Sequence, residues 1–377
     1  MKLIETAPDT YLRRRFKMYK TFRVAIALFI LMQLPGIIGS GDAAAAPQWY
    51  NGIVAQRGRS RVMAEFLQAY AVNPGAFDNA TLASYQAAIG VFDDALLVRL
   101  DPQVQFFYFQ ACSSLFISVA RQPELAAKLS NMLQSSCGTA ADYKRLTPKG
   151  QAGRMLVIAY MLEGIARQPE AYTTMLELAQ LYLAPLDKLG PLAPEAKVAR
   201  MEALSMLFES MARQPEATDM LKEVTLTYLG AADNTTLESP DVRAARILTI
   251  ATLCEDIARQ PEAASDLIAA ALQFCGPARP ADQYLPAPRH AYRQAVALLL
   301  NAVARNPGAV DAITGAFDEL TGAPFTGAFK TAAGQADAYY VFSALIDAVA
   351  ENPEVKAQLE TLFTTYTGLE IQPAFGL

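Results

Sequence analysis

The chain has 377 residues, of which 53% are hydrophobic and 18% are charged, so it is able to bury a large core and is not a disordered polypeptide. Residues 1–45 carry seven basic and three acidic side chains, a net charge of +4, which leaves −9 (−5 − 4) for the remainder. A remainder of that sign repels the phosphates of nucleic acids, and we expect no nucleic-acid partner.

The first 45 residues have the pattern of a targeting segment. The stretch from Val24 to Gly39 holds sixteen uncharged residues, follows a basic region and precedes a run of alanines. This order is typical of a secretory signal peptide, and at about 1.5 Å per residue the stretch is shorter than the ~30 Å hydrocarbon core of a bilayer. We expect cleavage after Ala45 and a periplasmic or secreted product. The alternative is an uncleaved anchor in the inner membrane formed by residues 24–39, and Met18 is an alternative start.

A repeat with a period of 46 residues fills the rest of the chain. Each unit has a proline with an alanine three residues before it, and after a first gap of 49 residues every later gap is 46. The segments before the prolines have apolar residues at helical spacing, such as Ile158, Leu162 and Ile165. Each proline suits the first turn of a second helix, with an asparagine before it as N-cap in three units (Asn73, Asn306 and Asn352). The seven prolines are Pro74, Pro123, Pro169, Pro215, Pro261, Pro307 and Pro353.

Each unit is therefore predicted to be a helix, a tight proline turn and a second helix. One such hairpin cannot bury its apolar face alone, but stacked neighbours can. We predict an all-α fold, a right-handed α-solenoid of about seven helix-turn-helix repeats. It has an N-terminal arm at 46–58, the solenoid at 59–367 and a C-terminal tail or cap at 368–377. The period resembles HEAT and armadillo repeats, about 40–47 residues long, in architecture; in HEAT repeats the proline usually falls inside the first helix.

Charged residues also recur at the 46-residue step. In one column an arginine precedes each proline turn, and three units have a glutamate four residues before it, the favourable helical orientation for an ion pair. We interpret this column as structural, worth about 0.3–0.5 kcal/mol per exposed pair, and a stripe for an acidic ligand is the alternative. The structural column consists of Arg121, Arg167, Arg213, Arg259 and Arg305, with Glu163, Glu209 and Glu255. A second column, Arg154, Arg200 and Arg246, has no fixed partner within its unit and is the candidate binding column.

The four cysteines follow the repeat as well. Cys112 and Cys137 lie at similar distances from the turn of one hairpin, so a disulfide between them is predicted for an exported protein. A bond between Cys254 and Cys275 is less favourable, because the two differ in height along the helices by roughly 10 Å. Buried free thiols are the alternative for all four.

No sequence motif indicates catalysis, a metal or a cofactor. His290 is the single histidine, which excludes a site with two histidine ligands and argues against a Ser-His-Asp triad. Trp49 and Tyr50 are expected to dock the N-terminal arm on the first repeat. We therefore predict a non-catalytic scaffold that binds protein partners, possessing no enzyme activity and using no cofactor, in an envelope complex if the N-terminus stays anchored. The alternatives are an α/α-toroid enzyme acting on carbohydrate and a self-assembling structural or coat protein.

Overall fold

The computed structural model describes residues 53–90, 101–138, 143–232, 239–278, 285–329 and 332–371. Within these ranges the chain forms fourteen α-helices and no strand, which confirms the all-α prediction. The expected signal or anchor segment (1–45), Trp49 and Tyr50, and the tail beyond residue 371 lie outside the described residues. Among the described helices, none has both the length and the apolar character needed to cross a membrane.

The helices alternate between long and short and pair into seven hairpins, the number predicted from the repeat. The long helices have 20 residues each and are α2 (Ile53–Val72), α5 (Pro102–Arg121), α7 (Pro148–Arg167), α9 (Pro194–Arg213), α11 (Pro240–Arg259), α13 (Pro286–Arg305) and α15 (Ala332–Glu351). The short helices have 11 or 12 residues and are α3 (Asn79–Ile89), α6 (Ala126–Cys137), α8 (Tyr172–Tyr182), α10 (Thr218–Tyr228), α12 (Ala264–Cys275), α14 (Val310–Thr321) and α16 (Lys356–Thr367). Because α2 starts at Ile53, the first hairpin begins inside the region predicted as an arm.

Prolines occupy the first position of most long helices and of the 3-10 turns that lead into the short helices. In the third hairpin Pro169 starts a 3-10 turn, η5 (Pro169–Ala171), that leads directly into α8. A proline lacks an N–H group and costs nothing at the first position of a helix, where that group has no partner. The predicted proline turn is thus confirmed. A second column of prolines, which the sequence analysis missed, begins five of the long helices: Pro102, Pro148, Pro194, Pro240 and Pro286.

The asparagines before the turn prolines are not N-caps. No side-chain capping bond forms at Asn306 or Asn352. Instead, the Asn306 Nδ2 donates to the carbonyl oxygen of Ala258 at 2.9 Å, and the Asn352 Nδ2 donates to that of Ala304 at 3.0 Å. Each acceptor belongs to the preceding hairpin. These side chains therefore join neighbouring units, and the capping prediction was wrong because it considered one unit in isolation.

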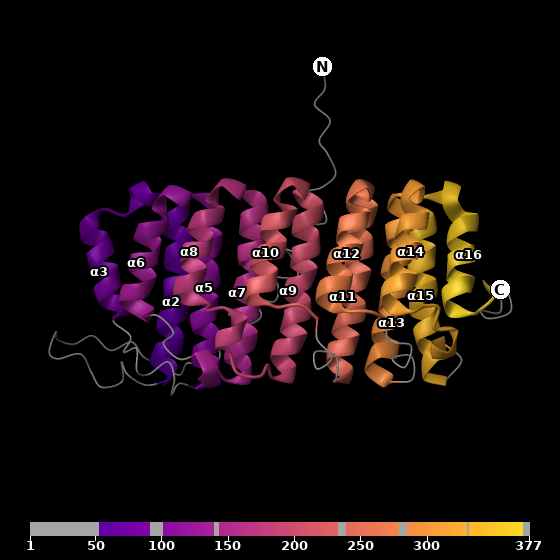
Figure 1. Cartoon of the computed structure of the whole chain (residues 1–377), viewed down its shortest axis with the longest axis horizontal. Helices are drawn as coiled ribbons and strands as arrows, with labels where there is room; N and C mark the ends of the chain where they lie inside the picture. Colours follow the sequence, from indigo (N-terminus) through magenta and orange to yellow (C-terminus); the bar gives the residue numbers. More distant parts are fainter. Residues whose placement is uncertain are drawn as a thin grey trace, which may run out of the picture. The chain divides into compact units, whose positions relative to one another are not determined.

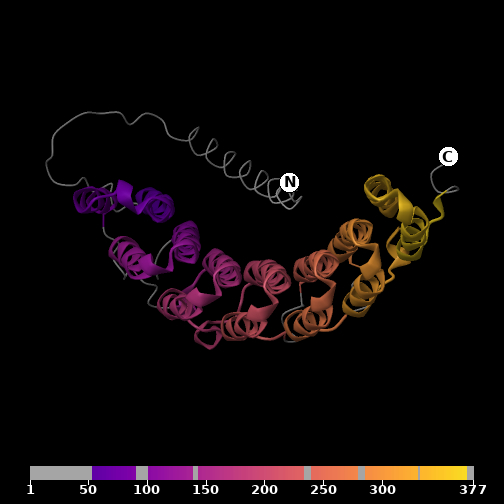
Figure 2. The ribbon, with the colours of Figure 1, turned by 90° about the horizontal axis from the view of Figure 1, so that it is seen from above.

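The hairpins lie side by side in chain order, with α2 and α3 at one end of the row and α15 and α16 at the other (Figure 1). Long helices of neighbouring units pack directly against one another. Seen along the helices, the described hairpins follow an arc in which the long helices make the inner row and the short helices the outer row (Figure 2). The buried core lies between the two rows, with Leu162, Leu207 and Leu253 among its fully buried side chains.

A glycine with positive φ terminates most of the short helices. Gly138 has φ 67° and ψ −166°, and Gly276 has φ 75° and ψ 176°, a backbone conformation that only glycine adopts readily. The third hairpin departs from this pattern. Ala184 occupies the glycine position of the third hairpin and has φ 49°. Among the described residues, no other non-glycine residue has a positive φ.

The cysteines are buried and free, so the predicted Cys112–Cys137 disulfide is not formed. The Cys137 thiol contributes to the raised pKa of Cys112, so the two groups interact electrostatically without a bond between them. The Cys254 Sγ donates to the carbonyl oxygen of Ile313 in the next hairpin, at 3.7 Å, and has no bond to Cys275. Burial raises the pKa of Cys137 to about 12, because a thiolate is poorly solvated in the core.

Candidate binding face

The arginine column chosen from the sequence as a candidate binding site is buried. Arg154 is 0% exposed, and Arg200 and Arg246 are each 1% exposed. The Arg154 Nε donates to the carbonyl oxygen of Leu183 at 2.7 Å, and its Nη2 donates to that of Ala184 at 2.6 Å. Both Nη atoms also donate to the carbonyl oxygen of Tyr228, at 3.1 and 3.2 Å.

The other two buried arginines repeat this geometry one and two units later. Arg200 donates to the carbonyl oxygens of Leu229, Gly230 and Phe274 at 2.9, 2.7 and 3.0 Å. Arg246 donates to those of Cys275, Gly276 and Leu320 at 2.9, 2.6 and 2.8 Å. Each guanidinium therefore binds the end of the short helix in its own hairpin and the end of the short helix in the next one.

A buried cation is tolerated here because two helix ends face it. The last carbonyl groups of a helix have no partner within the helix and carry a partial negative charge. For Arg154 these groups come from the ends of α8 and α10. Burial lowers the pKa of Arg154 to about 10, so the guanidinium stays charged at neutral pH. The structure thus corrects the binding assignment: this column fastens consecutive hairpins to one another and presents no surface to a ligand.

Tyrosines take the same position at the two ends of the arginine column. The Tyr108 hydroxyl donates to the carbonyl oxygen of Gly138 at 3.5 Å, within its own hairpin. The Tyr292 hydroxyl donates to the carbonyl oxygen of Tyr366 at 3.3 Å, in the next hairpin. The sequence analysis missed these residues, although both lie at the 46-residue step from Arg154 and Arg246.

The surface most suited to a ligand is the inner face, the side of the long helices that points away from the short helices. On α7 it consists of positions three or four residues apart, which stay exposed or half-buried while the residues between them are buried: Lys149, Ala152, Leu156, Tyr160, Glu163 and Arg167. The same six positions are exposed or half-buried on α9 and α13. Half-buried apolar side chains at the centre of this face include Leu156, Met206, Leu248 and Leu298.

Ion pairs run along one edge of the inner face. The Arg167 Nη2 donates to the Glu163 Oε1 at 2.5 Å, and the Arg213 Nη2 donates to the Glu209 Oε1 at 2.8 Å. Two of the predicted pairs at a spacing of four residues are therefore present. Arg121 is exposed, and its unit has Ile117 where these units have a glutamate.

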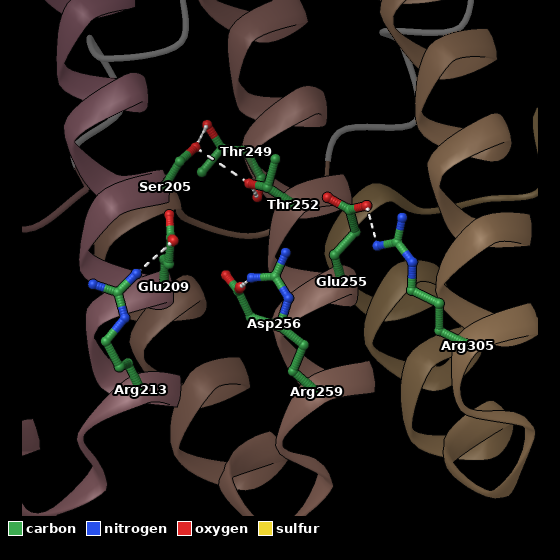
Figure 3. A network of polar contacts seen from close by, with 9 residues as sticks. All are labelled: Ser205, Glu209, Arg213, Thr249, Thr252, Glu255, Asp256, Arg259 and Arg305. Atoms are coloured by element: carbon green, nitrogen blue, oxygen red, sulfur yellow. Dashed lines mark hydrogen bonds and ion pairs between the residues drawn. The ribbon is translucent and has the colours of Figure 1, made fainter. Parts of the chain in front are cut away.

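In the next units one ion pair lies within α11 and one joins α11 to α13. The Arg259 Nη1 donates to the Asp256 Oδ1 at 2.9 Å, three residues before it, whereas the sequence predicted Glu255 as its partner. Glu255 accepts a bond of 3.1 Å from the Arg305 Nη1 of the following long helix. Figure 3 shows these pairs together with the hydroxyl cluster of Ser205, Thr249 and Thr252, in which the Thr249 Oγ1 lies 3.2 Å from the Ser205 Oγ. Carboxylates thus pair with Arg167, Arg213, Arg259 and Arg305 along this edge, which favours the structural interpretation of the column over a stripe for an acidic ligand.

His290 lies on the exposed side of α13. Its Nδ1 is 3.9 Å from the Oδ1 of Asp337, and Asp337 also forms an ion pair with Arg293. Gln294, one turn further along α13, is within 3.2 Å of its Nε2. Over the described ranges, no three or more His, Cys, Asp and Glu side chains come close enough to hold a metal ion.

Comparisons with models of known protein families, with curated proteins and with solved structures found no match to this chain. Its class is therefore defined by the described structure alone, as an all-α protein built from seven similar helical hairpins.

Proposed function

We propose that the protein is an open, right-handed α-solenoid that acts as a non-catalytic scaffold, binding a protein partner in the periplasm or another exported compartment. The observation that supports a binding role is the inner face: consecutive long helices present the same half-buried positions, apolar at the centre and charged at the edge. An apolar centre with a polar rim is the usual composition of a protein–protein interface. Stacked hairpins offer such a surface over a long distance.

The arrangement of the hairpins supports the open form over a closed ring. The first and last hairpins lie at opposite ends of the row in two views at right angles (Figures 1 and 2). A closed α/α-toroid would bring these two hairpins together.

A matched pair of variants in one hairpin tests the binding role. Leu156→Arg places a charge at the centre of the inner face, and Leu181→Arg places the same charge on the outer side of the short helix α8, where Leu181 is 39% exposed. Tagged protein is recovered from its native envelope, and the captured proteins are identified by mass spectrometry. We expect partners that co-purify with the wild type and with Leu181→Arg, and that are lost with Leu156→Arg. Retention of the same partners by both variants would refute a role for the inner face.

A further inference from the structure

The two end helices of the row, α2 and α15, carry on their outward sides the same kinds of residue that join neighbouring hairpins in the interior of the row. Inside the row, a side chain on one long helix packs against a small residue of the next: a Cβ atom at Gly153 would lie 3.1 Å from the Cβ of Phe109, and one at Gly164 would lie 3.3 Å from that of Ala120. The Thr249 Oγ1 donates to the carbonyl oxygen of Met201 at 2.9 Å across the next-but-one junction. Each long helix therefore has a forward side that contacts the following hairpin and a backward side that contacts the preceding one.

Positions on the forward side are buried in the interior units. Phe109, Met155, Met201 and Ile247 share one such position and are 0–1% exposed. Seven residues later, Phe116, Leu162, Phe208, Cys254 and Leu300 share another and are each 0% exposed. The bond from Cys254 to Ile313 of α14 shows that this second position reaches the following hairpin.

On the last long helix, α15, the same positions are on the surface. Tyr339 and Ile346 are 60% and 54% exposed, and Ala350, in the column of Ala120, is exposed as well. A terminal repeat normally carries polar residues on its outer side, since nothing stacks on it. Here that side keeps the apolar residues of an internal junction.

On the first long helix, α2, the backward side is exposed in the same way. Gly58 is in the register of Gly153, yet a Cβ atom there would meet nothing within 4 Å. Val62 is 53% exposed, whereas its counterparts Ala111, Val157 and Ala203 are 0% exposed. Ala69, in the register of Gly164, is also exposed. This side carries small residues, as the backward side does at the interior junctions.

The charges of the two end helices are opposite. Helix α2 has Arg57, Arg59 and Arg61 against Glu65, a net charge of +2 (3 − 1). Helix α15 has Asp337, Asp347 and Glu351 and neither lysine nor arginine, a net charge of −3. Part of this charge is neutralised inside the row, because Arg57 pairs with Asp101, Asp337 with Arg293 and Glu351 with Arg305. The charges outside those pairs leave +1 (2 − 1) on α2 and −1 (−3 + 2) on α15, so their signs still favour contact between α15 and α2.

We infer that the chain associates head to tail with a second copy of itself, the forward side of α15 stacking on the backward side of α2 of the next molecule. The new junction repeats the one between α7 and α9: Tyr339 and Ile346 take the places of Met155 and Leu162 on α7, and Gly58 and Val62 take the places of Ala199 and Ala203 on α9. A contact between two different surfaces of one molecule does not close on itself in a dimer, so it generates longer assemblies.

Two single substitutions, one at each end, test this arrangement in the full-length chain. Val62→Glu and Ile346→Glu each bury a carboxylate in the junction, which we expect to weaken self-association by more than about tenfold. Both sites are over half exposed in the single chain, so folding is preserved, which circular dichroism melting checks. Leu226→Glu, at a residue of α10 that is 51% exposed in the middle of the row, is the matched control.

Sedimentation velocity over a range of concentrations supplies the readout. Wild type and Leu226→Glu should grow beyond the dimer, while Val62→Glu and Ile346→Glu should each remain monomeric. An equal mixture of the last two should form dimers and nothing longer, because one intact α15 side and one intact α2 side remain. A monomeric wild type, a mixture that stays monomeric, or association that persists in either single variant would overturn the inference. The inner-face variant Leu156→Arg should assemble like wild type, which keeps this test separate from that of partner binding.

Discussion

The guanidinium of Arg154 donates two hydrogen bonds to the carbonyl oxygen of Tyr228, a residue 74 positions later in the chain. The same step of 74 residues relates Arg200 to Phe274 and Arg246 to Leu320. Since each arginine also binds the end of the short helix in its own hairpin, it couples two hairpins through one buried charge. The stability of each unit therefore depends on the unit that follows it.

Replacement of Arg200 by methionine should destabilise the protein strongly. The variant leaves three buried carbonyl groups without their donor, and we expect a loss of about 3 kcal/mol in the free energy of unfolding. Arg213→Met, which removes the exposed pair with Glu209, should cost less than about 0.5 kcal/mol. Urea titration followed by circular dichroism measures both. Equal losses in the two variants would contradict the coupling role of the buried column.

Replacement of Ala184 by glycine should stabilise the protein. The residue has φ 49°, where an L side chain costs about 1–2 kcal/mol and glycine does not. Part of that gain is offset by the greater freedom of glycine in the unfolded chain, so we expect a net gain of about 0.5–1 kcal/mol. Ala152→Gly, the same change inside the right-handed helix α7, should instead cost about 1 kcal/mol. A loss of stability in Ala184→Gly, measured by calorimetry, would show that the backbone is not left-handed there.

The carboxyl group of Glu202 should destabilise the fold at neutral pH. It lies on the inner face in the column of Leu156 and Leu248, and burial by the surrounding protein raises its pKa above 4.5 even though part of the side chain is exposed. A raised pKa means that the folded state disfavours the charged form, so this cost is present above the folded pKa and disappears below the unfolded one. Glu202→Gln should therefore raise the free energy of unfolding at pH 7 by less than about 1 kcal/mol, with a corresponding rise in Tm, and should change Tm less at pH 4.

Calorimetry at the two pH values checks this, with Glu216→Gln, at an exposed residue of the proline turn, as the control. An equal change in Tm at both pH values would exclude ionisation of Glu202 as the cause.

The four thiols should remain reduced and unreactive in the folded protein. They are buried, and burial raises the pKa of Cys137 to about 12, so little thiolate is present near neutral pH. A thiol-specific reagent should modify no cysteine of the native chain and all four in denaturant. An intact mass lower by one pair of hydrogen atoms before reduction would show instead that the originally predicted disulfide forms.

The regular parts of the fold follow from the sequence because they are local. The proline spacing predicts the seven hairpins and their turns, since a proline at the start of a helix acts through its own backbone. The ion pairs of Arg167 and Arg213 follow from a spacing of four residues within one helix. The position of a hairpin relative to its neighbour is not encoded locally. For this reason Asn306, whose acceptor lies in the preceding hairpin, was assigned the wrong role.

The burial of Arg154 was nevertheless visible in the sequence. It lies four residues before Ile158 and eleven before Ile165, so the helical period places it on the same buried side. Tyrosine at the same step on both flanks of the column, Tyr108 and Tyr292, was a second signal. What no spacing reveals is the acceptor, because the end of the next short helix comes close only after the hairpins stack. The inner face was missed for a related reason, since it exists only as the sum of several helices.

Because each buried arginine binds a carbonyl group of the following hairpin, its donor is synthesised before its acceptor. Translation delivers the donor of each such bond 74 residues before its acceptor, so Arg154 must wait for Tyr228 to emerge. Until then its charge faces only the end of its own short helix. A chain that ended after the third, fourth or fifth hairpin would therefore end on a unit whose buried cation lacks its second helix end.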